Sequence, residues 1–164
     1  DFDLEAYLNL GTGALTAIGE GHCFDLGGIT LEVVHLPGHT AGSIGLWSPE
    51  RKLLWVGDAM NCFVWLFLPE AQGLRIYIDT LRKAGKLPFT HMIQSHEPEP
   101  VPKEKLRDYL DLAEHLDFEA GALVPTPFGH EMETRICTRN GIHYDDREHP
   151  GFAAIMISRK NAEG

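Results

Sequence analysis

Apolar residues recur along this chain with two different periods, and each period predicts one kind of element. Short alternating or continuous apolar runs, rich in β-branched and aromatic residues, predict strands. These strands are expected at residues 29–34, 43–47, 52–56, 89–93 and 152–157. Apolar residues at helical spacing predict helices over residues 1–18, 70–86 and 103–118. Strands alternating with helices indicate an α/β fold in which helices cover one sheet.

Turn-forming residues separate these elements. Ser48-Pro-Glu-Arg51 predicts a hairpin loop between two strands. Asn140-Gly141 is a strong two-residue hairpin signal, so residues 131–139 and 142–144 are expected to pair. Residues 121–129, rich in Pro and Gly, are expected to form a loop.

Composition narrows the class of protein. A chain of 164 residues with 43% hydrophobic residues suits one globular domain, and the net charge of −10 argues against a nucleic-acid partner. Three widely spaced cysteines favour neither a disulfide framework nor a zinc ribbon, so we expect a reducing cytoplasm. The longest apolar run, residues 62–68, is too short to span a bilayer, and no membrane partner is expected. No secretory signal opens the chain. Its first residue is Asp rather than Met, which fits a fragment.

Two histidines flank a tight turn after the first of these strands. His35 and His39 are four residues apart, but Pro37-Gly38 between them excludes a shared helical face. His39 is therefore a candidate metal ligand on a loop at the rim of the sheet. The alternative is a turn histidine hydrogen-bonded to the backbone.

Two further candidates also follow predicted strands. Gly57-Asp58 ends an apolar strand, where a carboxylate is costly unless it is paired, hydrogen-bonded or bound to metal. His96 follows the strand at residues 89–93. Taken separately, an Asp that follows Gly, such as Asp58, more commonly caps a turn. His96 taken separately is explained as a surface-loop histidine. Because strand carboxyl ends converge on one rim of an α/β sheet, the three together predict a metal site.

Aromatic residues alternate just after Asp58. Phe63, Trp65 and Phe67 are candidates for the wall of a substrate pocket, and a buried strand or an interface explains the same pattern.

These motifs resemble those of the metallo-β-lactamase-fold hydrolases. His39-Thr-Ala-Gly-Ser43 resembles the third metal motif of that family, Gly57-Asp58 the fourth and Ser95-His96 the fifth. Glu97 stands where many relatives have Gly, and Ala41 where Pro is common. The resemblance implies a four-layer αββα sandwich, of which residues 1–164 would form a single partial domain, mainly the second βα half. The His-x-His-x-Asp-His motif, which supplies most of the family's ligands, is absent from this chain.

The resemblance also implies a chemistry. His39 would bind the first metal, His96 the second, and Asp58, the expected catalytic residue, would bridge both. Two zinc ions are usual, with iron or manganese in some relatives, and a metal-bound hydroxide would attack a small ester, thioester, lactone, amide or phosphoester. The chain by itself would be incomplete or inactive. The alternative is a non-catalytic interaction module derived from the fold, forming a homodimer or complementing an amino-terminal half.

Overall fold

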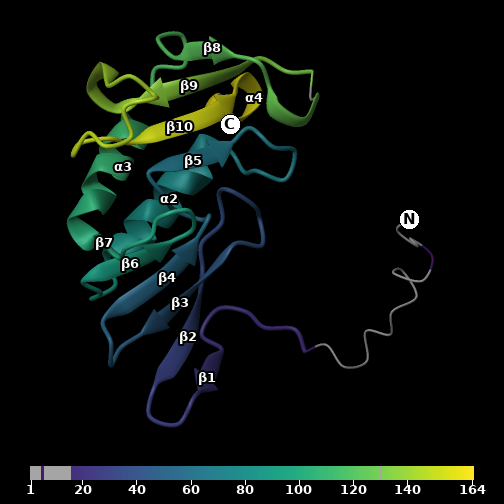
Figure 1. Cartoon of the computed structure of the whole chain (residues 1–164). Helices are drawn as coiled ribbons and strands as arrows, with labels where there is room; N and C mark the ends of the chain where they lie inside the picture. The colour runs from purple at the N-terminus through teal and green to yellow at the C-terminus, as the bar shows by residue number, and fades with distance from the viewer. Residues whose placement is uncertain (1–4, 6–15, 130) are drawn as a thin grey trace.

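Two mixed β-sheets form the framework of the protein. The computed structural model describes residues 5, 16–129 and 131–164. The larger sheet has the strand order β1-β2-β3-β4-β6-β7, and the smaller one β5-β10-β9-β8 (Figure 1). The strands of the larger sheet are β1 (Cys23–Asp25), β2 (Thr30–His35), β3 (Ile44–Ser48), β4 (Leu53–Gly57), β6 (His91–Gln94) and β7 (Val101–Pro102). Those of the smaller sheet are β5 (Phe63–Leu66), β8 (Ala122–Val124), β9 (Thr134–Thr138) and β10 (Ala154–Ser158).

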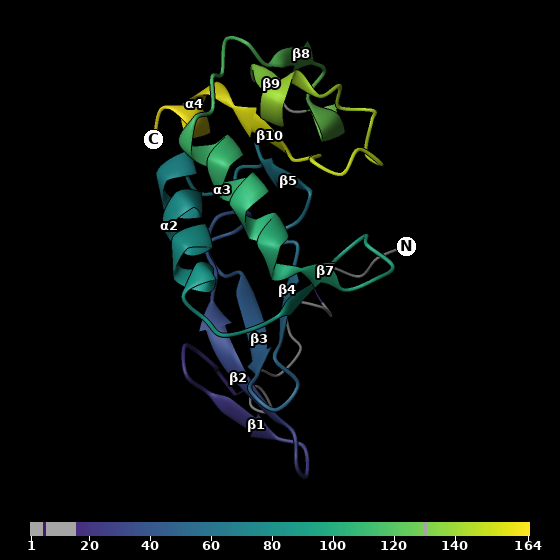
Figure 2. The same cartoon turned by 90° about the vertical axis from the view of Figure 1, so that its left-hand side faces the viewer.

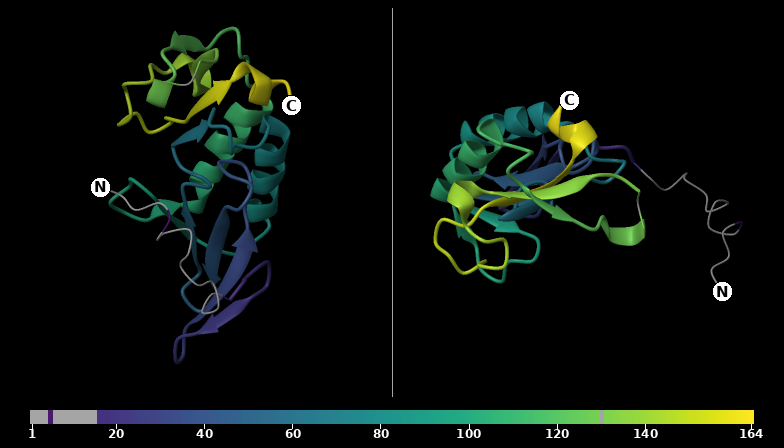
Figure 3. Two further views of the ribbon diagram at one scale, coloured as in Figure 1. Left: turned by 90° about the vertical axis from the view of Figure 1, so that its right-hand side faces the viewer. Right: turned by 90° about the horizontal axis from the view of Figure 1, so that it is seen from above.

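Two α-helices lie side by side and cover one side of this framework. They are α2 (Leu74–Gly85) and α3 (Leu106–Glu114), and Figure 2 shows them in front of the strands. The view from above in Figure 3 also places them on one side. A shared apolar core joins both helices to both sheets, because it contains Leu81, Tyr109, Leu54 and Ile155 together. Shorter helical segments are η2 (Lys103–Lys105), η3 (Pro127–Gly129), η4 (Arg139–Gly141) and α4 (Arg159–Ala162).

The alternation of side chains along the strands decides which face meets the helices. Trp47 pairs with Leu54 and Leu54 with Met92, and all three are buried. One residue along, Leu46 pairs with Trp55 and Trp55 with Ile93, and these three are half-buried. Because neighbours along a strand point to opposite faces, this second row marks the side away from the helices.

Most predicted elements of the α/β fold are confirmed. The predicted strands correspond to β2, β3, β4, β6 and β10, and the turn at residues 48–51 joins β3 to β4. The helices predicted over 70–86 and 103–118 are observed as α2 and α3, with shorter bounds. The helix predicted over 1–18 falls largely outside the described residues, and residues 16–18 are not helical.

Two predictions for the carboxy-terminal third are wrong. Asn140 and Gly141 have the positive φ angles of a hairpin turn, 53° and 67°, but Ile142–Tyr144 is not a strand. The partner of β9 is β10, which the chain reaches after a polar loop. The segment predicted as a loop at 121–129 contains β8, which pairs with the other edge of β9. The short strand β1 was not predicted, whereas β5 agrees with the buried strand that the alternating aromatic residues left open as an alternative.

Two further observations bear on the chemical environment of the chain. Within the described ranges, every helix is either too short or too polar to cross a membrane. Cys23, Cys62 and Cys137 are all free thiols.

Candidate metal centre

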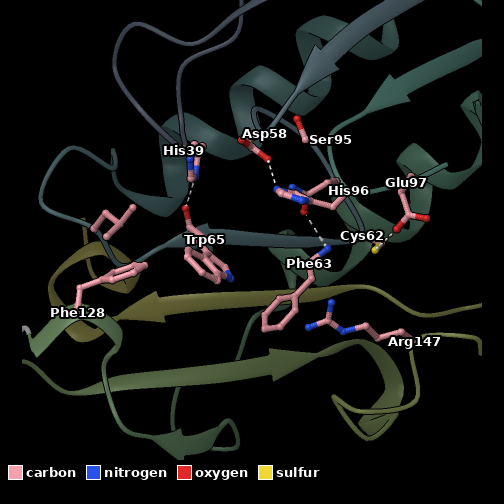
Figure 4. Close-up of a pocket in the computed structure, with 12 residues that line it drawn as sticks. His39, Asp58, Cys62, Phe63, Trp65, Ser95, His96, Glu97, Phe128 and Arg147 are labelled. Carbon is pink, nitrogen blue, oxygen red and sulfur yellow. Dashed lines mark hydrogen bonds and ion pairs between the residues drawn. The ribbon is translucent and has the colours of Figure 1, made fainter.

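Three strand ends meet at one edge of the larger sheet and bring the candidate ligands together. β4 and β6 are neighbouring parallel strands, and β2 runs in the same direction because two antiparallel pairings separate it from β4. His39, Asp58 and His96 follow these three strands and line one cavity of about 460 Å³ (Figure 4).

Asp58 and His96 lie in direct contact across the β4–β6 pair. Asp58 Oδ1 is 3.3 Å from His96 Nε2. Each side chain is aimed by a left-handed turn, with φ of 52° at Gly57 and 67° at His96. The backbone N–H of Ser95 donates to the Gly57 carbonyl at 3.1 Å, which fixes the two turns relative to each other. Both side chains line the cavity, and 45% of the Asp58 side chain and 82% of the His96 side chain are exposed.

His39 is positioned by a turn packed on helix α2. Thr80 of α2 donates a hydrogen bond to the Pro37 carbonyl. Gly38 lies so close to Tyr77 that a Cβ there would stand 2.9 Å from the Tyr77 ring. His39 Nδ1 lies 2.8 Å from the carbonyl oxygen of Trp65, so this nitrogen carries the proton and donates. The lone pair of Nε2 is then free to bind a metal ion.

The residues present fit a metal ion as a partial set of ligands. Two atoms each about 2.0–2.1 Å from a tetrahedral zinc ion stand about 3.3–3.4 Å apart, which matches the Asp58–His96 spacing. His39 has the tautomer that metal-binding histidines adopt. However, no three His, Cys, Asp or Glu side chains in the described part of the chain lie close enough together to hold an ion. His39 therefore faces the same cavity without joining the Asp58–His96 pair.

The predicted aromatic wall is present in part. Phe63 and Trp65 of β5 line the cavity below the candidate ligands (Figure 4). Phe67 does not line it, because that side chain is 1% exposed and packs in a second apolar cluster with Phe152 and Met156.

Several cavity residues were not identified from the sequence. The Cys62 thiol donates a hydrogen bond to Glu97 Oε1 at 3.0 Å. Burial, and then the bond to Glu97, raise the pKa of Cys62 to about 12. Arg147 and Phe128 line the cavity from loops far along the chain. Arg147 lies in a polar stretch in which no sequence pattern marks a functional residue. Phe128 is an isolated aromatic residue in a Pro- and Gly-rich segment, and that pattern could have identified it from the sequence.

Comparison with known proteins identifies the family to which these motifs point. The family described as the metallo-beta-lactamase superfamily matches residues 10–96, more than half of the chain. A beta-lactamase-like protein 2 homolog from Caenorhabditis elegans is 27% identical over 130 residues, which cover 78% of this chain and 42% of that protein. A hydroxyacylglutathione hydrolase from Hyphomonas neptunium is 29% identical over 126 residues, covering 70% of this chain and 48% of the relative. The chain thus spans less than half the length of these relatives.

Solved structures agree on the fold. ETHE1 from Myxococcus xanthus superposes with a TM-score of 0.51 at 17% identity, covering 73% of this chain and 58% of that one. An archaeal metallo-beta-lactamase superfamily protein from Sulfolobus tokodaii has a TM-score of 0.51 at 15% identity, covering 70% and 44%. At such low identity these matches show the fold alone, and they agree with the fold that the resemblance implies.

Proposed function

Because the chain belongs to the metallo-beta-lactamase superfamily, whose members are generally metal-binding hydrolases, we propose that it forms part of a metal-dependent hydrolase acting on a small acyl compound. The observation that carries this proposal is the spacing of 3.3 Å between Asp58 Oδ1 and His96 Nε2, on a cavity that His39 also faces. Further ligands would come from a segment outside this chain.

His39, Asp58 and His96 are the residues that would hold the metal, with Asp58 placed between the two histidines in Figure 4. Nitrogen and oxygen ligands of this kind suit zinc, and also iron or manganese. A metal ion held there supplies Lewis-acid chemistry, lowering the pKa of water toward 7 and polarising a carbonyl group.

The side chains of this protein have their own parts in the reaction. The Trp65 carbonyl fixes the tautomer and orientation of His39. The half-exposed Asp58 carboxylate can accept a hydrogen bond from water and so orient it toward a bound substrate. Phe63 and Trp65 exclude water from one side of the cavity and offer an apolar surface to the substrate.

The substrate class and the compartment belong to the same proposal. The hydroxyacylglutathione hydrolase from Hyphomonas neptunium supports an acyl substrate. Three free thiols support a reducing compartment such as the cytoplasm.

Zinc binding tests this function directly on the 164-residue chain. Isothermal titration should show zinc binding that weakens at least about tenfold in Asp58→Asn and in His96→Ala. His91→Ala is the matched control, because His91 is an exposed histidine of β6 outside the cavity. Equal zinc affinity of the wild type, Asp58→Asn and His96→Ala would contradict the proposal.

The row formed by Leu46, Trp55 and Ile93 favours a second candidate function. These three apolar side chains are half-buried on the side of the sheet away from α2 and α3. A second copy of the chain could cover them, which makes the chain an association module. Light scattering should then give twice the monomer mass of 18.3 kDa, and a monomer would exclude this candidate.

A further inference from the structure

Arg147 brings a positive charge to the cavity from the loop between η4 and β10. Its guanidinium carbon lies 4.9 Å from the centroid of the Phe63 ring, a cation–π distance. The residues beside it are acidic (Asp145, Asp146 and Glu148), yet in the described part of the chain no carboxylate lies within ion-pair distance of it. Its N–H donors are therefore available to a ligand in the cavity.

The loop that carries Arg147 is held at both ends. The backbone N–H of Asp146 donates to the His143 carbonyl at 2.9 Å, and that of His149 to the Asp146 carbonyl at 3.3 Å. Lys105 of η2 donates to the Pro150 carbonyl, and Phe152 beyond it is 2% exposed. The guanidinium is therefore presented from a fixed backbone, which lowers the entropy cost of binding through it.

Aromatic side chains form the opposite end of the same cavity. Phe128 is 74% exposed, and its ring centroid lies 6.1 Å from that of Trp65. Its φ angle of 61° is unfavourable for an aromatic residue. Thr126 holds this conformation, because its hydroxyl donates to the Met132 carbonyl at 2.7 Å across the loop. A strained backbone that keeps an apolar ring exposed beside a cavity is typical of a binding position.

Figure 4 shows how these groups are ordered. Phe128, Trp65, Phe63 and Arg147 follow one another along the lower side of the cavity, and the candidate ligands lie above them. A volume of about 460 Å³ suits a small organic molecule.

We propose that this cavity binds an aryl or alkyl monocarboxylate, with its carboxylate on Arg147 and its apolar group packed against the Trp65 and Phe128 rings. The charges favour one negative charge on the ligand, because the Arg147 guanidinium and the Glu97 carboxylate line the same cavity and the charges of both act on the Cys62 thiol. A phosphate dianion would bring two negative charges into the cavity beside the Glu97 carboxylate. The single guanidinium of Arg147 would have to compensate all of these charges, so a monoanion is favoured. Hydrolysis of an ester or thioester bond in a ligand that also carries this carboxylate rests on the proposed function, whereas binding of the carboxylate does not.

Calorimetric titration with 4-phenylbutanoate tests this site on the 164-residue chain. We expect the wild type to bind it at least about tenfold more tightly than 4-phenylbutanamide, because a hydrogen-bonded charge is lost in the amide. Arg147→Gln should lose that preference, and Arg147→Lys should retain part of it. Arg107→Gln removes the same charge from an exposed position on α3 and should leave binding unchanged.

Phe128→Ala should weaken the binding of 4-phenylbutanoate and of 4-phenylbutanamide by the same factor, because the aromatic end of the cavity contacts the phenyl group that both compounds carry. Equal affinity of the wild type and Arg147→Gln for 4-phenylbutanoate would overturn the proposal. Tighter binding of 4-phenylbutylphosphonate than of the carboxylate would also overturn it. Carboxylate binding that depends on Arg147, together with a zinc affinity that is unchanged in Asp58→Asn and His96→Ala, would support this site and refute the proposed function. Zinc binding without carboxylate binding would support the proposed function and refute this carboxylate site.

Discussion

The Asp58 carboxylate and the His96 imidazole are in contact, at 3.3 Å, although helix α2 separates them in the sequence. Their contact follows from the parallel pairing of β4 with β6, in which Gly57 is the partner of Gln94. Parallel strands need a crossover between them, and α2 supplies it. The helix that completes the core thus also determines which two strand ends become neighbours.

Replacing Gly57 by Ala should disturb this contact. Gly57 has a φ of 52°, and a Cβ there would meet nothing closer than Ser95 Oγ at 3.7 Å. The cost is therefore conformational, about 1–2 kcal/mol of the free energy of unfolding, and zinc affinity should fall because Asp58 is displaced. Urea denaturation and zinc titration measure the two effects. Gly42→Ala is the control, since Gly42 has neither a positive φ nor a neighbour within 4 Å.

The local part of this site could be predicted from the sequence, and the distant part could not. Val56-Gly57-Asp58 contains both the end of a strand and the turn that aims the carboxylate. Arg147 and Phe128 reach the cavity through loops whose path depends on tertiary packing. Asn140-Gly141 illustrates the same limit, because its backbone adopts the expected turn while the strand partner of Ile136 is the more distant Met156.

At position 128 a Gly variant should be more stable than an Ala variant, although Gly is usually the more destabilising of the two residues. At a φ of 61° Gly avoids the strain that Ala retains, so Phe128→Gly should be about 1 kcal/mol more stable than Phe128→Ala. Both variants lose the ring contact with Trp65, so the comparison isolates the backbone. Thermal and urea unfolding of the pair measure the difference. Equal stability would show that the loop relaxes when the ring is removed.

The thiol of Cys62 should resist alkylation although it borders a cavity. Burial and the hydrogen bond to Glu97 raise its pKa to about 12, and the thiolate is the reactive form. Glu97→Gln removes the negative charge, so the pKa should fall and alkylation by iodoacetamide at pH 8 should become faster. Because burial remains, Cys62 should still react more slowly than the exposed Cys23. Peptide mass spectrometry reads each cysteine separately, and an unchanged rate in Glu97→Gln would contradict the assigned cause.

Glu133 should make the stability of the protein depend on pH in the acidic range. Arg159 Nε donates to one of its carboxylate oxygens at 2.7 Å and Arg135 Nε to the other at 3.1 Å. Hydrogen bonds from Arg159, and then from Arg135, lower the pKa of Glu133 below its usual value of 4.5. A lowered pKa in the folded state means that the ionised form is favoured by folding. The resulting stability is present above pH 4.5 and is lost as the pH falls through the lower, folded-state pKa.

Glu133→Gln should therefore lower the Tm at pH 7, and the difference from the wild type should shrink steadily below pH 4.5. Circular dichroism melts between about pH 7 and pH 3 follow that difference. Glu104→Gln makes the same change of charge at an exposed position of η2 and should show no such convergence. A difference that stays constant across the range would mean that Glu133 acts through the packing of its side chain rather than through its charge. Because Arg159 and Arg135 also lie over the Phe118 ring, at 4.7 and 5.4 Å, loss of the carboxylate leaves both cations with a remaining partner. The expected change in Tm is therefore small, and its dependence on pH is the decisive observation.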